Sequence, residues 1–187
     1  MTRWFERLPS AVFGLLSLSA ATGCGSDTEE GKMIATSGEA RLVVYENPYA
    51  MMPDAPNTIG SAATASATAW DMGGKLKLSL SGAGLPPDRD FGSHLHKLGC
   101  DNGKAGGHYQ HTVAPSTEAV SDPMYANPDN EAWLDFKTDS QGKVTIERTV
   151  AWLPRPGEAK AIIFHDKKTD MNGKAGDKLA CLPLALP

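Results

Sequence analysis

The sequence predicts a mainly β domain, a β-sandwich or flattened barrel of about eight antiparallel strands. Short runs of residues alternate between apolar and polar side chains, and they are rich in β-branched and aromatic types. Gly, Pro, Asn and Asp separate these runs, as is typical of turns between strands. Helical periodicity is hard to find beyond the N-terminal segment, so we expect little helix.

Seven runs account for most of the predicted strands. The run 40–45 is rich in valine and ends before Asn47-Pro48, whereas 75–80 alternates strictly, with leucines inward and polar residues outward. The other predicted strands are 62–70, 92–96, 131–137, 143–153 and 159–165, with turns at 71–74 and 139–142. The long segments 97–130 and 166–180 are predicted to be loops, where functional residues usually lie.

The N-terminal residues have the pattern of an export signal. Arg3 and Arg7 precede an apolar stretch at 11–18, and small residues then lead to Cys24. The apolar stretch is too short to span a bilayer, which takes about 20 residues. We therefore expect residues 1–23 to be removed as a signal peptide.

The residues before Cys24 are similar to a bacterial lipobox, in which the cysteine carries lipid and becomes the new N-terminus. Ala21 stands where leucine is usual, and ordinary signal-peptidase cleavage is the alternative. Residues 24–38, rich in Gly, Ser, Thr and acidic side chains, have the composition of a flexible tether for one domain at 39–187. We therefore expect a lipoprotein of the cell envelope, periplasmic or anchored in the outer membrane through Cys24.

The net charge and the cysteine content of the chain limit the partners and the disulfide that we expect. Removal of residues 1–23 takes two of the 18 basic and one of the 22 acidic side chains, which leaves 16 and 21 and a net charge of −5. Nucleic acid is therefore not expected as a partner. With Cys24 lipidated, Cys100 and Cys181 remain as a pair in an oxidising compartment, which predicts a disulfide; two separate buried thiols are the alternative. The sequence leaves the oligomeric state open, a homodimer included.

The five histidines are the most informative feature of the sequence. Four fall within residues 94–111, and the fifth, His165, ends an apolar run. In Ser93-His94-Leu95-His96 the two imidazoles are two residues apart, so on a strand they project from the same face. His108 follows two glycines, and glycine lets the backbone approach a metal closely. The pattern favours a single metal ion, although a lone His-X-His pair also occurs by chance on surface strands.

The spacing of these residues resembles that of copper/zinc superoxide dismutases. The resemblance covers roughly residues 40–182 and consists of five separated matches in the family's order. The matching segments are Phe91-Gly92-Ser93-His94-Leu95-His96, Gly99-Cys100, Ala105-Gly106-Gly107-His108-Tyr109, Ile163-Phe164-His165-Asp166 and residues 173–181. The fold that this resemblance implies is an immunoglobulin-like Greek-key β-sandwich.

By this resemblance, four histidines match the family's copper ligands: His94, His96, His108 and His165. Imidazole ligands also suit copper on chemical grounds. Cys100 and Cys181 match the family's disulfide, and His108 matches the ligand that bridges copper to zinc and transfers a proton. The implied activity is dismutation of superoxide, the small-molecule substrate, to oxygen and hydrogen peroxide.

The family's usual zinc site is missing from the sequence. Its two further histidines and its aspartate have no clear counterpart, because the nearest positions hold Ser116, Asn127 and Asn130. A substitute second metal site could form from His111 and Asp129 with His108, but a solvated loop histidine is the more common outcome. Copper is therefore the expected cofactor and zinc is doubtful.

The anion site also departs from the family. Lys178 stands where the family has an arginine beside copper; lysine keeps the charge that attracts superoxide but loses the planar fork that fixes a small anion. In the family, the loop after the last copper ligand also carries a carboxylate that supports a ligand from outside. Asp166 and Asp170 are candidates for it, and a pair of solvated loop charges is the alternative. The sequence thus predicts a superoxide dismutase of reduced activity, an antioxidant oxidoreductase. The alternative is a non-catalytic copper-binding or copper-buffering envelope domain.

Overall fold

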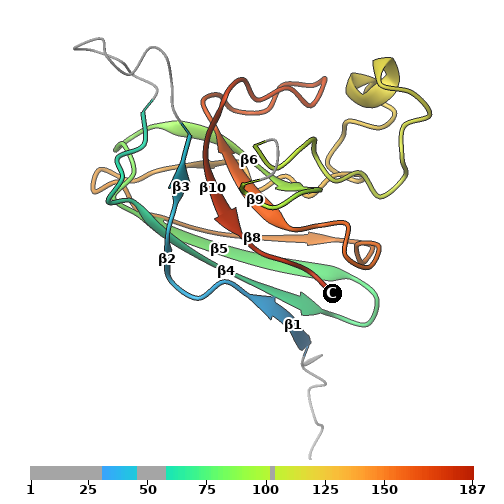
Figure 1. The fold of residues 1–187 in the computed structure, drawn as a ribbon, viewed down its shortest axis with the longest axis horizontal. Coiled ribbons are helices and arrows are strands. Elements are labelled where there is room, and N and C mark those ends of the chain that lie inside the picture. The colour runs from blue at the N-terminus through green and yellow to red at the C-terminus, as the bar shows by residue number, and fades with distance from the viewer. Residues whose placement is uncertain (1–30, 46–57, 102–103) are drawn as a thin grey trace, which may run out of the picture.

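The computed structural model describes residues 31–45, 58–101 and 104–187, so the predicted signal peptide and residues 24–30 of the predicted tether, Cys24 included, lie outside it. These residues form two antiparallel sheets that pack against each other (Figure 1). In the first sheet the order is β1-β4-β5-β8, and β2 also pairs with β4; the strands are β1 (Lys32–Thr36), β2 (Ala40–Arg41), β4 (Thr64–Asp71), β5 (Leu76–Ala83) and β8 (Val144–Val150). In the second sheet the order is β3-β10-β9-β6-β7, with β3 (Val43–Val44), β10 (Lys178–Pro183), β9 (Ala161–His165), β6 (Asp90–His96) and β7 (Phe136–Lys137).

The predicted mainly β sandwich is confirmed. Strands far apart in the chain are neighbours, since β5 pairs with β8 and β6 with β9, and the chain crosses between the sheets from β5 to β6 and from β8 to β9. The strands form two open sheets within the described ranges, so the flattened-barrel form of the prediction does not apply. A short 3₁₀ helix, η1 (Glu118–Ser121), lies in the loop before β7. The part of the chain described here has no long apolar helix of the kind that spans a bilayer.

Small and large side chains alternate across the core face of the first sheet. The alanines of β4 point inward opposite the leucines of β5, as in the pairs Ala67 with Leu80 and Ala69 with Leu78. Leucines and aromatic residues of the second sheet fill the space that the alanines leave. Burial of this apolar surface is the main stabilising term for the sandwich.

The second sheet is buried on both faces at β6 and β9. In β6 and β9 one set of alternate residues, such as Leu95, Ile162 and Phe164, joins the main core. The opposite set includes the histidines, and long loops on either side cover it. Gly92 permits this cover, because a Cβ there would lie 2.5 Å from Ala175 Cβ.

Two predicted elements near the N-terminus differ from the structure. The predicted strand 40–45 divides at Leu42 into β2 and β3, which belong to different sheets, because Leu42 itself turns into the core. The predicted tether 24–38 contains β1, which pairs with β4. Ile34 and Ala35 pack against the core, an apolar contact that the polar composition of the segment concealed.

Two further elements differ toward the C-terminus. Of the predicted strand 131–137, only Phe136–Lys137 is a strand, since the preceding residues contribute a single bridge between His94 and Trp133. The predicted loop 166–180 ends earlier than expected, at Lys178, where β10 begins. β10 was not predicted, because Leu179, Ala180, Cys181 and Leu182 are all buried and do not alternate with polar residues.

Candidate metal centre

Three parts of the second sheet bring four histidines together. His94 and His96 project from one face of β6, and His165 ends the neighbouring strand β9, opposite Gly92. His108 lies in the loop after β6 and returns to that strand through a bridge with His96. The predicted ligands therefore converge, although 71 positions separate the first from the last.

The geometry of the four rings fits a single metal ion. One nitrogen from each ring lies within 4.8 Å of the other three. His94 Nδ1 is 2.9 Å from His108 Nε2, and His96 Nε2 is 3.3 Å from His165 Nε2. Imidazole nitrogens bound at about 2.0 Å to one ion lie roughly 3 to 4 Å apart, so modest adjustment suffices.

Each ring also has a polar partner for the nitrogen that faces away from the centre. His96 Nδ1 lies 3.0 Å from the Gly106 carbonyl, and His165 Nδ1 lies 3.3 Å from the Gly176 carbonyl. The outer partners of the other two rings are side chains, Thr169 for His94 and Glu131 for His108. Such outer contacts fix the orientation and the tautomer of metal-binding histidines.

Burial keeps three of the rings uncharged. The pKa of His94 and that of His96 lie well below 6.5, mainly because burial disfavours the charged ring and further because the neighbouring histidines repel a positive charge. For His165, burial and the nearby His108 lower the pKa to about 3. Neutral rings offer free nitrogen lone pairs, which is the form that binds a metal.

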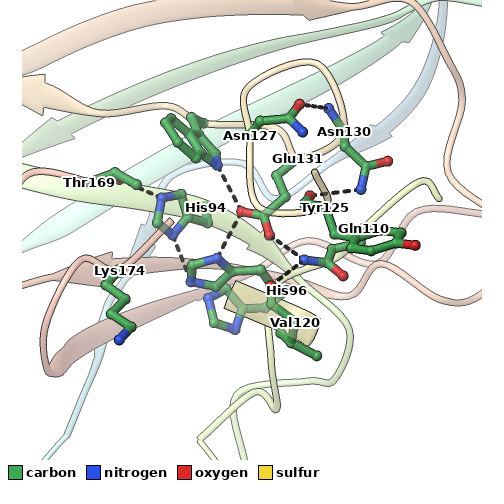
Figure 2. A network of polar contacts seen from close by, with 12 residues as sticks. His94, His96, Gln110, Val120, Tyr125, Asn127, Asn130, Glu131, Thr169 and Lys174 are labelled. Atoms are coloured by element: carbon green, nitrogen blue, oxygen red, sulfur yellow. Dashed lines mark hydrogen bonds and ion pairs between the residues drawn. The ribbon is translucent and has the colours of Figure 1, made fainter. Parts of the chain in front are cut away.

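Glu131 is a functional residue that the sequence did not reveal. The residue is 1% exposed. Its carboxylate accepts hydrogen bonds from His108 Nδ1 at 3.0 Å, Trp133 Nε1 at 2.8 Å and Gln110 Nε2 at 2.8 Å (Figure 2). The available signal was an acidic residue beside the apolar run Ala132-Trp133-Leu134, which is unusual for a buried segment. Glu131 occupies the outer side of His108, the ring that the resemblance assigned to bridging zinc.

The carboxylate nearest His94 is Asp135, and neither of the two aspartates suggested by the sequence takes that place. Asp135 Oδ1 lies 3.6 Å from His94 Nε2 and accepts a hydrogen bond from Thr169 Oγ1 at 2.7 Å. Asp166 and Asp170 instead accept backbone hydrogen bonds within the loop after β9, from Asp177 N and Lys174 N respectively. They stabilise the loop.

Lys178 lies beside the cluster but its ammonium group is engaged. Nζ donates to the carbonyl of Lys104 at 2.8 Å and also to that of Gly106. Burial, and then the nearby Lys104, lowers the pKa of Lys178. Lys178 and Lys174 line the same cavity, of about 380 Å³, as His96, His108 and His165. The cavity gives the histidine cluster access to solvent between two cationic side chains.

The remaining predicted residues have other surroundings. The ring of His111 stacks on Trp152, with centroids 5.1 Å apart, and Asp129 is exposed. In the described ranges, the only group of metal-ligand side chains comprises the four histidines, so neither residue joins it. Cys100 and Cys181 form the predicted disulfide, which links the loop after β6 to β10.

Comparisons with known proteins define a class of fold. No protein-family model matches the chain, and no curated protein does. Among solved structures, a double mutant of a SOD-like protein from Bacillus subtilis superposes with a TM-score of 0.53 at 18% identity. The match covers 82% of this chain and 99% of that one. The chain therefore has a SOD-like fold, and its four histidines form a group that could bind a metal.

Proposed function

We propose that this chain is a copper-dependent superoxide dismutase of the cell envelope. The observation that carries the proposal is the cluster of four imidazoles, each with one nitrogen toward a common centre and the other fixed by a polar partner. Preoriented imidazoles suit copper, and a SOD-like fold supports the same conclusion. We propose no separate zinc site.

The chemistry requires one electron and two protons to be moved. Bound copper would supply one-electron redox chemistry, so that one superoxide loses an electron to become oxygen and a second gains it, with two protons, to become hydrogen peroxide. We assign one proton to Nε2 of His108, which would take it up only when that nitrogen is not bound to the metal. Because the Glu131 carboxylate accepts the hydrogen of Nδ1, Nε2 is the nitrogen left to take up and release a proton toward the cavity.

We assign the attraction of the superoxide anion to two lysines that line the cavity. Lys174 and Lys178 give the cavity two cations, whereas its one acidic residue, Glu131, is already engaged by three donors. A cationic entrance concentrates an anionic substrate, and the effect weakens as salt screens the charges. Because Lys178 is held by two carbonyl groups, we expect attraction at a distance and poor fixation of the bound anion.

Pulse radiolysis of the copper-loaded protein tests this function. We expect superoxide to decay faster than with the same amount of free copper, with a rate that falls as ionic strength rises. The Lys178→Met variant should be slower and less sensitive to salt, whereas the matched variant Lys143→Met, remote from the cavity, should behave as the wild type. Decay no faster than with free copper would rule out dismutation.

A non-catalytic copper-binding domain is the second candidate. The observation that favours it is the engaged ammonium group of Lys178, because a cation already bound to two carbonyls contributes little to binding of an anion. Tight copper binding without any turnover would select this candidate.

Export and membrane attachment belong to the proposal as well. The basic residues, the short apolar stretch and Cys24 support a lipid anchor in the envelope. Metabolic labelling with a radioactive fatty acid should mark the wild type and not the Cys24→Ala variant. Label on both proteins, or on neither, would contradict lipidation of Cys24.

A further inference from the structure

A chain of polar contacts connects the metal ligand His94 to a carboxylate through a hydroxyl group. His94 Nε2 lies 2.6 Å from Thr169 Oγ1, which donates to Asp135 Oδ1 at 2.7 Å. The direct distance from His94 Nε2 to Asp135 Oδ1 is 3.6 Å, too long for a hydrogen bond. His94 is fully buried, so no solvent replaces the contact. Figure 2 shows Thr169 directed at the ring of His94.

The donors and acceptors of this chain have only one consistent order. A carboxylate only accepts, so the hydroxyl hydrogen of Thr169 points to Asp135, and its oxygen then accepts the hydrogen of His94 Nε2. His94 Nδ1 is left with a free lone pair. This is the nitrogen that faces the other histidines.

The hydrogen-bond donors and acceptors around His108 also leave a free lone pair that faces the centre of the histidine cluster. Glu131 accepts the hydrogen of His108 Nδ1, so His108 Nε2 also carries a free lone pair. The two lone pairs, on His94 Nδ1 and His108 Nε2, face each other across 2.9 Å. Two facing lone pairs repel until a cation lies between them. Carboxylates at both ends thus prepare the centre for a metal.

Thr169 also belongs to the loop that borders the cavity. Its backbone N–H donates to Asp135 Oδ2 at 2.8 Å, so the residue is joined to Asp135 twice. Residues 172–176 of the same loop line the cavity, Lys174 among them. Asp135 precedes β7 and also accepts from Ser93 N of β6, which ties it firmly to the sheet.

We propose that Thr169 is a positioning residue that holds His94 in its metal-binding tautomer and joins the metal site to the loop 166–177. The inference rests on the metal-binding part of the proposed function. A metal on His94 Nδ1 would withdraw electron density from the ring, so the Nε2–H that Thr169 already accepts becomes a stronger donor and holds the loop more firmly. Metal binding and loop order are therefore coupled through one hydroxyl group.

Replacement of Thr169 by valine tests the inference, because valine has the same shape and lacks only the hydroxyl. We expect the Thr169→Val variant to bind Cu(II) about 10- to 100-fold more weakly in a competition titration with a chelator. Its Cu(II) electron paramagnetic resonance spectrum should also change. Thr169→Ser keeps the hydroxyl and should restore both. Thr149→Val, at an exposed position of β8, should match the wild type.

Hydrogen exchange measures the coupling to the loop. Copper should slow amide exchange in 166–177 in the wild type, and Thr169→Val should lose this protection. Should valine disturb folding, Thr169→Ala removes the same hydroxyl with less bulk and carries the same expectation.

The outcomes separate this inference from the proposed activity. Wild-type copper affinity, spectrum and loop protection in Thr169→Val would overturn the role of Thr169 and leave dismutation standing. Normal copper binding that depends on Thr169, without turnover of superoxide, would overturn dismutation alone.

Discussion

Glu131 holds the outer nitrogen of His108, the side on which the family resemblance would place zinc. It is a buried carboxylate with three donors, and one of them is the ring that we assign to proton transfer. A side chain with only one acceptor oxygen in place of the Glu131 carboxylate would therefore weaken this hydrogen-bond network and change the orientation of His108.

The Glu131→Gln variant tests this role. A glutamine side chain has one acceptor oxygen and an NH₂ group, so at least one of the three buried donors loses its acceptor. We expect the free energy of unfolding to fall by about 1–3 kcal/mol and the copper affinity to fall with it. The matched variant Glu147→Gln, in an exposed pair with Lys77, should change stability by less than about 1 kcal/mol. Equal effects of the two variants in urea unfolding would contradict a special role for Glu131.

The sequence predicted the ligands of the site better than their supports. His94 and His96 are detectable because two residues on one strand face the same way, and the spacing of the family resemblance added His108 and His165. Thr169 and Glu131 act through contacts across 75 and 23 positions of the chain. The acid at position 131 beside an apolar run indicated a buried carboxylate but not its partners, whereas a threonine in a loop, such as Thr169, carried no signal.

Among the elements, the sequence predicted strands in which apolar and polar residues alternate strictly. It did not predict a strand that is buried on both faces. The alternating leucines of β5 define the strand and its inward face, whereas the uniformly buried residues of β10 have no period of two. The short β7 shows the opposite error. Its apolar neighbours Ala132 and Leu134 are buried, but this segment pairs with β6 too little to form the long strand that was predicted.

The disulfide joins the loop after β6 to β10, and both elements support the ligands. Cys100 lies in the loop whose Gly106 carbonyl orients His96, and β10 begins at Lys178, which donates to the same carbonyl. Reduction of the bond should therefore loosen the metal site as well as the fold.

We expect the Cys100→Ser/Cys181→Ser double variant to be less stable, by up to roughly 4 kcal/mol in the chain-entropy model for a loop of this length. Its copper affinity should fall too, because the Gly106 carbonyl is no longer held in place. Thermal unfolding and a copper titration measure the two effects. A double variant that unfolds earlier but binds copper as tightly as the wild type would show that the disulfide stabilises the fold without supporting the site.

The stability of the whole molecule should depend on pH through the buried histidines when no metal is bound. Their pKa values are lowered in the folded chain, to about 3 for His165, so the unfolded chain binds more protons below pH 6.5. The free energy of unfolding is therefore highest above pH 6.5 and declines as the pH falls toward 3. Three such groups give a slope of up to about 4 kcal/mol per pH unit.

Urea unfolding of the metal-free protein between pH 7 and pH 4 measures this decline. The His165→Asn variant should show a shallower slope, because one of the three groups no longer titrates. A wild-type free energy of unfolding that stays constant over this range would contradict the assignment of neutral, buried rings.

The fold of the whole molecule places one histidine cluster between two loops and leaves His111 and Asp129 outside it. We predict that these four rings hold one copper ion without an accompanying zinc site. Copper and zinc content, measured on the protein purified from the cells that make it, is the decisive measurement. We predict about one copper per chain with negligible zinc, and loss of the copper in the His165→Ala variant. One copper and one zinc per chain, or no copper at all, would contradict a copper site without zinc.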